Sequence, residues 1–165
     1  MKNGLHQLFL NELADIYSAE QQLVKALPKM AENAGSAELR SAFESHLRET
    51  ENHVVRLERA FESLAESPSS HKCKAMKGLI AEGKEILGDY EGTECVDAAL
   101  IAAAQKIEHY EIATYGCLCT WAELMGHAQA LQLLRENLTE EKAADEKLTA
   151  IAKSRANMEA QAEAA

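Results

Sequence analysis

The chain has 165 residues, of which 47% are hydrophobic and only 5% aromatic, with two prolines and eight glycines. This length suits one domain with its own core, and we expect residues 1–165 to form a single domain. The chain carries 27 acidic and 17 basic residues, a formal net charge of −10, which argues against nucleic acid and anionic membrane surfaces as partners.

The hydrophobic pattern predicts four long helices and one short one. The first runs from about residue 5 to 33 and ends near Gly35, a position suited to a left-handed cap. Pro28 lies inside it and is expected to kink it. The second follows Ser36, a good N-cap residue, and runs to about residue 66. Residues 67–70 form a Ser- and Pro-containing linker, and a weaker helix is expected over residues 75–87.

The second half of the chain repeats the long-helix pattern. Thr93 is a candidate N-cap for a third long helix, which is expected to end at Gly126. The fourth runs from about residue 127 to 157. Residues 158–165, rich in Ala, Gln and Glu, are expected to form a frayed tail.

The lengths of the connections select an architecture. One to three residues join the first long helix to the second, and the third to the fourth, so each pair must be an antiparallel hairpin. About 26 residues separate the hairpins, enough to cross the length of a bundle. This connectivity predicts an all-α, ferritin-like four-helix bundle with a long crossover that carries a short extra helix. The crossover disfavours the alternatives, a simple up-and-down bundle and a coiled-coil dimer.

The surroundings and partners of the protein follow from other features. The N-terminal residues lack the apolar core of a signal peptide, and no uninterrupted apolar run could span a bilayer. The cysteines show neither a CxxC pair nor zinc-finger spacing; they are Cys73, Cys95, Cys117 and Cys119. We therefore expect a cytoplasmic protein with reduced cysteines. Additional apolar residues beside the stripe of the first helix favour a homodimer; they are Leu8, Phe9, Leu10 and Val24.

Each long helix carries ligand-type side chains on the apolar stripe that would face the core. In the first helix, Glu20 interrupts a series formed by Leu13, Ile16, Leu23 and Leu27. The other three helices repeat this feature near their middles. The candidate metal ligands are Glu20, Glu49, His53, Glu108, Glu111, Glu141 and Asp145.

Carboxylates on buried faces need a compensating charge, because burying an unpaired one costs several kcal/mol. The stripes carry no lysine or arginine at the same level. Two divalent cations would supply four positive charges together with a preference for oxygen ligands. Carboxylate with imidazole suits iron or manganese, and zinc less specifically. We therefore expect two metal ions as cofactors, with iron favoured.

Taken singly, each of these residues has an ordinary explanation, such as a boundary glutamate whose head reaches water or a core histidine with satisfied hydrogen bonds. The two hairpins, however, repeat one pattern: Glu20 precedes Glu49-x3-His53, and Glu108 precedes Glu141-x3-Asp145. This repeat favours a dinuclear centre. His46 and Glu111 lie within a turn of it and could replace a ligand or orient one. The alternative is that pairs such as Glu141 and Asp145 sit on the flank and bind nothing.

Four segments together resemble the YciF-like family of bacterial ferritin-like stress proteins. They are ELADIYSAEQQL (12–23), LRETENHV (47–54), AQKIEHYEIA (104–113) and EEKAADEKL (140–148). The resemblance covers roughly residues 5–155 and implies a rubrerythrin-related bundle in the bacterial cytoplasm, usually dimeric, with a poorly defined activity. It implies Glu20, Glu49, Glu108 and Glu141 as ligands, with His53 and Asp145 beside them.

Some features depart from ferritin-like di-iron proteins. Those proteins use Glu-x-x-His on two helices, whereas the spacing here is i,i+4 and Asn52 occupies the expected histidine position. Without a CxxC pair for a rubredoxin-type iron, a redox-active protein would need a separate electron donor. Nothing indicates a cage-forming helix after the fourth long helix, which counts against iron storage.

Two classes of function remain open. One is a di-iron oxidoreductase, such as a ferroxidase or peroxidase-like enzyme, that oxidises ferrous iron with oxygen or peroxide. The other is a non-enzymatic stress or interaction protein whose metal site is structural or vestigial. The sequence does not identify catalytic residues for either.

Overall fold

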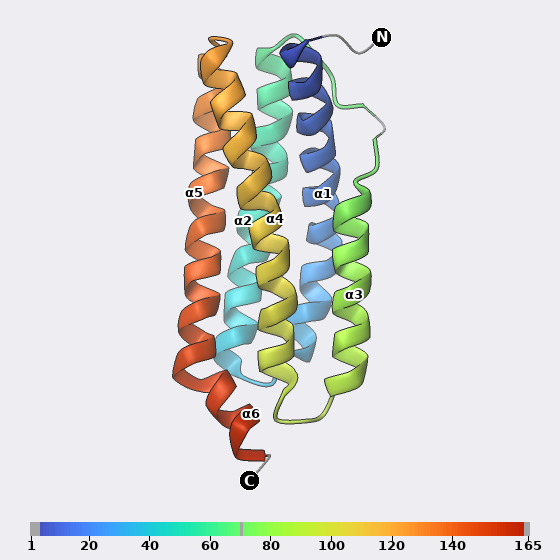
Figure 1. Ribbon diagram of the computed structural model, residues 1–165, viewed down its shortest axis with the longest axis vertical. Helices are drawn as coiled ribbons and strands as arrows, with labels where there is room; N and C mark the ends of the chain where they lie inside the picture. The colour runs from blue at the N-terminus through green and yellow to red at the C-terminus, as the bar shows by residue number, and fades with distance from the viewer. Residues whose placement is uncertain (1–3, 70, 164–165) are drawn as a thin grey trace.

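The computed structural model describes residues 4–69 and 71–163, and within them it contains helices and no strand (Figure 1). Four long helices form the bundle: α1 (Leu5–Asn33), α2 (Ala37–Ser63), α4 (Val96–Leu124) and α5 (Ala128–Ile151). The connection between α2 and α4 carries α3 (Lys74–Tyr90). After α5 the chain continues through a π-helical turn (Ala152–Ala156) into α6 (Asn157–Glu163).

The four long helices form a closed ring around one core. Both α1 and α5 pack against α2 and against α4. Each hairpin is antiparallel, and the chain travels back along α3 from the end of α2 to the opposite end of the bundle, where α4 begins (Figure 1). The helix α3 packs on α1 and α4. This arrangement confirms the predicted ferritin-like bundle with its crossover helix.

The helix ends differ from the expected ones in detail. The helix α3 extends beyond residues 75–87 at both ends, and α4 begins at Val96. Thr93 precedes α4 by a short turn, in which its hydroxyl accepts a hydrogen bond from the Cys95 backbone N–H at 3.2 Å. Gly126 has a φ of 75°, the left-handed conformation expected at the end of α4. Where fraying was expected from residue 158, the chain is helical to Glu163.

The turn between α1 and α2 is held in place from α4. Asp97, which is buried, accepts hydrogen bonds from the backbone N–H groups of Gly35 at 2.6 Å and Ser36 at 2.9 Å. The Ser36 hydroxyl caps α2 as expected, accepting from the Leu39 N–H. Gly35 is not left-handed; instead, a Cβ there would lie 3.2 Å from Asp97 Oδ1. A larger residue at this position would therefore crowd Asp97, and glycine suits the close approach.

The apolar surface expected beside the stripe of α1 is smaller than the sequence suggested. Phe9 is completely buried in the bundle core, whereas Leu8 is 43% exposed. Leu10 and Val24 are half-buried. The homodimer remains a prediction. Within the described residues, every helix is too short or too polar to cross a membrane.

We expect Asp97→Ala to lower the free energy of unfolding of the metal-free protein by about 3 kcal/mol, because two backbone N–H groups lose a charged acceptor. The control is Glu94→Ala, which removes an exposed carboxylate from the loop before α4 and should change this free energy by less than about 0.5 kcal/mol. Urea denaturation followed by circular dichroism measures both. Equal, small effects would contradict the role assigned to Asp97.

Candidate metal centre

Six ionisable side chains lie buried near the middle of the four long helices. The most exposed of them, His46, is only 6% exposed. One comes from α1, two from α2, two from α4 and one from α5, in the order Glu20, His46, His53, Glu108, Glu111 and Glu141. Each occupies a position on the buried stripe of its helix that an apolar residue would otherwise fill.

These side chains form two groups that share one member. In the first, His46 Nε2 lies 3.2 Å from Glu108 Oε1 and 3.6 Å from Glu141 Oε2, and Glu111 completes the group. In the second, His53 Nδ1 lies 2.8 Å from Glu141 Oε1 and 3.3 Å from Glu20 Oε1. Within each group the potential ligand atoms lie within 4.8 Å of one another. Each group could therefore hold a metal ion, and Glu141 offers one oxygen to each.

The hydrogen bonding of these residues is incomplete. Among the described residues, eight buried nitrogen and oxygen atoms of the six side chains have no hydrogen-bond partner, including both oxygens of Glu111 and both of Glu141. Buried polar groups are normally satisfied, and buried charges are paired or bind metals. His53 Nδ1 and Glu141 Oε1 approach closely without hydrogen-bond geometry, as expected for atoms directed at a common ion. The donor set therefore fits a pair of metal ions.

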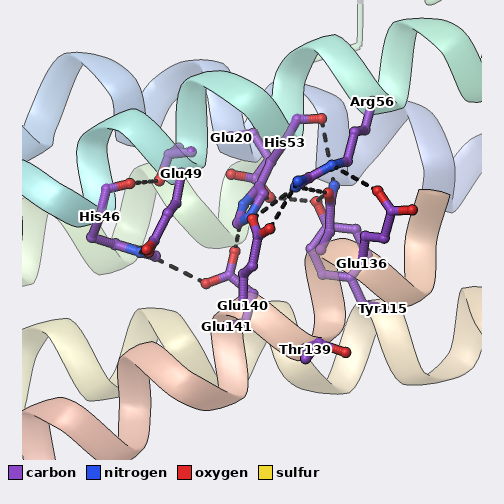
Figure 2. Close-up of polar contacts among 12 residues, drawn as sticks. Glu20, His46, Glu49, His53, Arg56, Tyr115, Glu136, Thr139, Glu140 and Glu141 are labelled. Carbon is purple, nitrogen blue, oxygen red and sulfur yellow. Dashed lines mark hydrogen bonds and ion pairs between the residues drawn. The ribbon is translucent and has the colours of Figure 1, made fainter.

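Each histidine is held from its outer side by a partly exposed carboxylate. His53 Nε2 lies 2.9 Å from Glu140 Oε2, and Arg56 binds both oxygens of Glu140 at 2.7 and 2.8 Å. His46 Nδ1 lies 3.3 Å from Glu49 Oε2. Figure 2 shows His53 and Arg56 of α2 reaching toward Glu140 of α5. A histidine with one nitrogen toward a metal and the other bonded to a carboxylate is the usual arrangement around bound metal ions.

A further buried network orients Glu20. The Tyr115 hydroxyl donates a hydrogen bond to Glu20 Oε1, and Asn137 Nδ2 donates to the Tyr115 hydroxyl oxygen at 3.0 Å. Tyr115 and Asn137 are both fully buried. The hydrogen bond between Tyr115 and Glu20 leaves the second oxygen of Glu20 without a partner, available to the centre.

The structure brings together five of the seven sequence-predicted ligands: Glu20, His53, Glu108, Glu111 and Glu141. Glu49 and Asp145 lie in neither group. The Glu49 side chain is 40% exposed and contacts His46 instead, and Asp145 accepts a hydrogen bond from Gln105 Nε2 at 3.0 Å. His46, which the sequence indicated as a possible replacement, is in the first group. The assignment of individual ligands stays a prediction.

Sequence reasoning missed the outer residues Arg56, Asn137 and Glu140. Arg56 and Glu140 resemble charges on a solvated helix face, and their side chains are 19% and 32% exposed. A signal for Arg56 was available, because it lies three residues after His53 and therefore on the same side of α2.

Without metal, neighbouring charges favour protons on several of these groups. Burial alone would lower the pKa of His53, but Glu20 and Glu141 raise it to about 10. Glu108 likewise raises the pKa of His46 well above 6.5 against the effect of burial. Burial, with the neighbouring carboxylates, raises the pKa of Glu111 well above its ordinary value. Metal ions would displace these protons, so metal affinity should increase with pH.

We expect the metal-free protein to lose stability as the pH rises above 6.5. A group whose pKa is raised by folding binds more protons in the folded chain, so its contribution to stability is lost as the pH rises through its folded-state pKa. For His53 the window runs from 6.5 to about 10, and His46 shifts in the same direction. Thermal denaturation of chelator-treated protein across this range measures the effect. Stability that stays constant or rises would contradict it.

The matched controls for this pH dependence are two histidine variants. His53→Gln removes a titrating group of the cluster and should flatten the dependence. His109→Gln removes a histidine whose side chain is 70% exposed and should leave the dependence as it is in the unaltered protein.

We expect Glu111→Leu to stabilise the metal-free protein by about 1–3 kcal/mol, because an unsatisfied buried carboxylate is replaced by an apolar side chain of similar size. Glu146→Leu, at an exposed glutamate of α5, is the control and should change stability by less than about 0.5 kcal/mol. Chemical denaturation in the presence of a chelator compares the two. A destabilised Glu111→Leu would show that Glu111 stabilises the fold in its own right.

Comparison with known proteins identifies relatives over nearly the whole chain. Residues 4–161 match the family described as a domain of unknown function, DUF892. The chain is 46% identical to Protein YciF of Escherichia coli over 158 residues, with 95% of each chain covered. The crystal structure of the E. coli stress protein YciF matches with a TM-score of 0.90 at 47% identity, over 95% of this chain and 99% of that one.

Two further solved structures have the same fold. YcfI from Rhodopseudomonas palustris, provisionally described as a structural protein, matches with a TM-score of 0.87 at 46% identity, over 90% of this chain and 94% of that one. A protein from Xanthomonas campestris shares the fold with a TM-score of 0.75 at 21% identity, over 98% and 99% of the two chains. From the family match and the 46% identity to YciF, this chain belongs to the DUF892 family.

Proposed function

We propose that this protein holds two iron ions between Glu20, His46, His53, Glu108, Glu111 and Glu141. The observation that carries the proposal is the position of Glu141, which has one oxygen facing His46 and the other facing His53. A carboxylate shared by two neighbouring ions takes such a position. The four carboxylates balance the four positive charges of two divalent cations, with both histidines neutral. Oxygen and imidazole ligands suit iron; manganese fits similarly and zinc less specifically.

The proposed activity is oxidation of ferrous iron by hydrogen peroxide or oxygen. Two bound ferrous ions would supply the two electrons that, with two protons, reduce one hydrogen peroxide molecule to two water molecules. The residues of the chain bind and orient: the inner side chains hold the ions, while Glu140 and Glu49 fix the two histidines from outside. A separate electron donor would return the iron to the ferrous state for another round.

The similarity to the E. coli stress protein YciF supports a role in a stress response, which we place in the cytoplasm. A second candidate is a non-enzymatic protein in which the metal only stabilises the bundle. The provisional description of the R. palustris relative as structural favours this candidate. The two differ in one measurable respect: only the first predicts that peroxide oxidises the bound ferrous iron stoichiometrically.

Metal-free protein loaded anaerobically with ferrous iron should bind two ions per chain. Glu141→Gln should weaken binding by about 100-fold or more, because it removes the charge that both groups share. Glu146→Gln, which removes an exposed carboxylate of the same helix, should leave the stoichiometry at two. Metal analysis after equilibrium dialysis gives the numbers. Equal iron content in the two variants would contradict the proposed centre.

A further inference from the structure

An opening between α2 and α5 leads from the surface to the first group of the metal centre. It has a volume of about 120 Å³, and a cavity of about 15 Å³ is enough for one water molecule. The buried residues His46 and Glu108 line it from within, and the exposed residues Ala143 and Lys147 line its rim. Solvent-sized species therefore have a path to two of the six buried side chains.

At the inner end of this opening lie two buried atoms that lack hydrogen-bond partners. His46 Nε2 and Glu108 Oε2 are buried, and neither has a hydrogen-bond partner among the described residues. These two residues are 6% and 2% exposed. A nitrogen and a carboxylate oxygen at the end of an open path are the first buried ligands that an incoming cation would meet.

The wall of the opening carries the charge that a cation requires. Glu49 lines it, and its side chain is 40% exposed. Glu140 also lines it, but Arg56 pairs with both of its oxygens. Carboxylates in a cleft with low-dielectric walls raise the local concentration of cations and their rate of association. Lys147 also lines the opening, and its positive charge opposes this attraction.

We propose that this opening is the passage by which a divalent cation reaches the metal centre from solvent. The inference rests on the metal centre proposed above and adds the route to it. Glu49 attracts the ion, Lys147 slows its entry, and the small side chains of Ala143 and Ala144 keep the passage open. Glu49 thereby has a second role at the outer side of His46, in transfer of the ion from solvent to the first group.

Narrowing the passage should slow metal binding without changing how much metal is bound. In stopped-flow absorbance measurements with Co²⁺ as the only added metal, Ala144→Leu should reduce the association rate at least about fivefold. Ala150→Leu makes the same change at an exposed position of α5 that does not line the opening, and its rate should match that of the unaltered protein. Both variants should bind the same amount at equilibrium.

Reversing the charge at the rim tests whether the route carries cations. At low salt, Lys147→Glu should accelerate Co²⁺ association about threefold, and the gain should vanish at high ionic strength. Lys142→Glu changes the net charge equally at an exposed position of α5 outside the opening, and it should have a smaller effect.

The outcomes distinguish failure of the proposed passage from failure of the proposed metal centre. If the unaltered protein binds Co²⁺ but Ala144→Leu and Ala150→Leu bind it at equal rates, the passage is overturned and the centre stands. If the unaltered protein binds no metal, both are overturned. If Ala144→Leu does not fold, Ala143→Leu can replace it, because it narrows the same opening at an exposed position. Its Co²⁺ association rate is then compared with that of Ala150→Leu in the same way.

Discussion

The negative charge buried at the middle of the bundle is the constraint on which the rest of the structure depends. Glu20, Glu108, Glu111 and Glu141 are each at most 2% exposed, and burying an unpaired carboxylate costs several kcal/mol. Arg56 ion-pairs with the outer carboxylates Glu136 and Glu140. The compensating charge must then come from protons or from bound cations. Metal binding and folding stability are coupled through this choice.

The connectivity of the bundle brings these side chains to one level. Because the crossover returns the chain along α3, α4 starts at the same end as α2 and each long helix has two antiparallel neighbours. Ligand-type residues near the middle of each helix then meet in the core. Hydrogen bonds between the helices fix the orientation of these side chains: Tyr115 holds Glu20, and Glu140 holds His53. The bundle thus preorganises the proposed centre in the absence of metal.

The fold could be predicted from the hydrophobic pattern of the helices together with the connection lengths, because hairpin, long crossover and hairpin permit few arrangements. The ligand set could be predicted only in part. Periodicity shows which side of a helix faces the core, but not how far the helix is rotated about its axis relative to the centre of the core. Residues four apart, such as Glu49 and His53, differ by about 40° around a helix, whereas residues seven apart, such as His46 and His53, differ by about 20°. The smaller angle places both histidines in the core and leaves Glu49 at the edge.

Anomalous X-ray diffraction from crystals of the protein loaded with ferrous iron without oxygen tests the central claim most directly. The account predicts two iron peaks per chain, about 3.5–4 Å apart, on either side of the Glu141 carboxylate. A single peak, or peaks only at exposed carboxylates such as Glu136, would contradict it. The positions of the peaks relative to His46 and His53 would also show which nitrogen of each ring faces the metal.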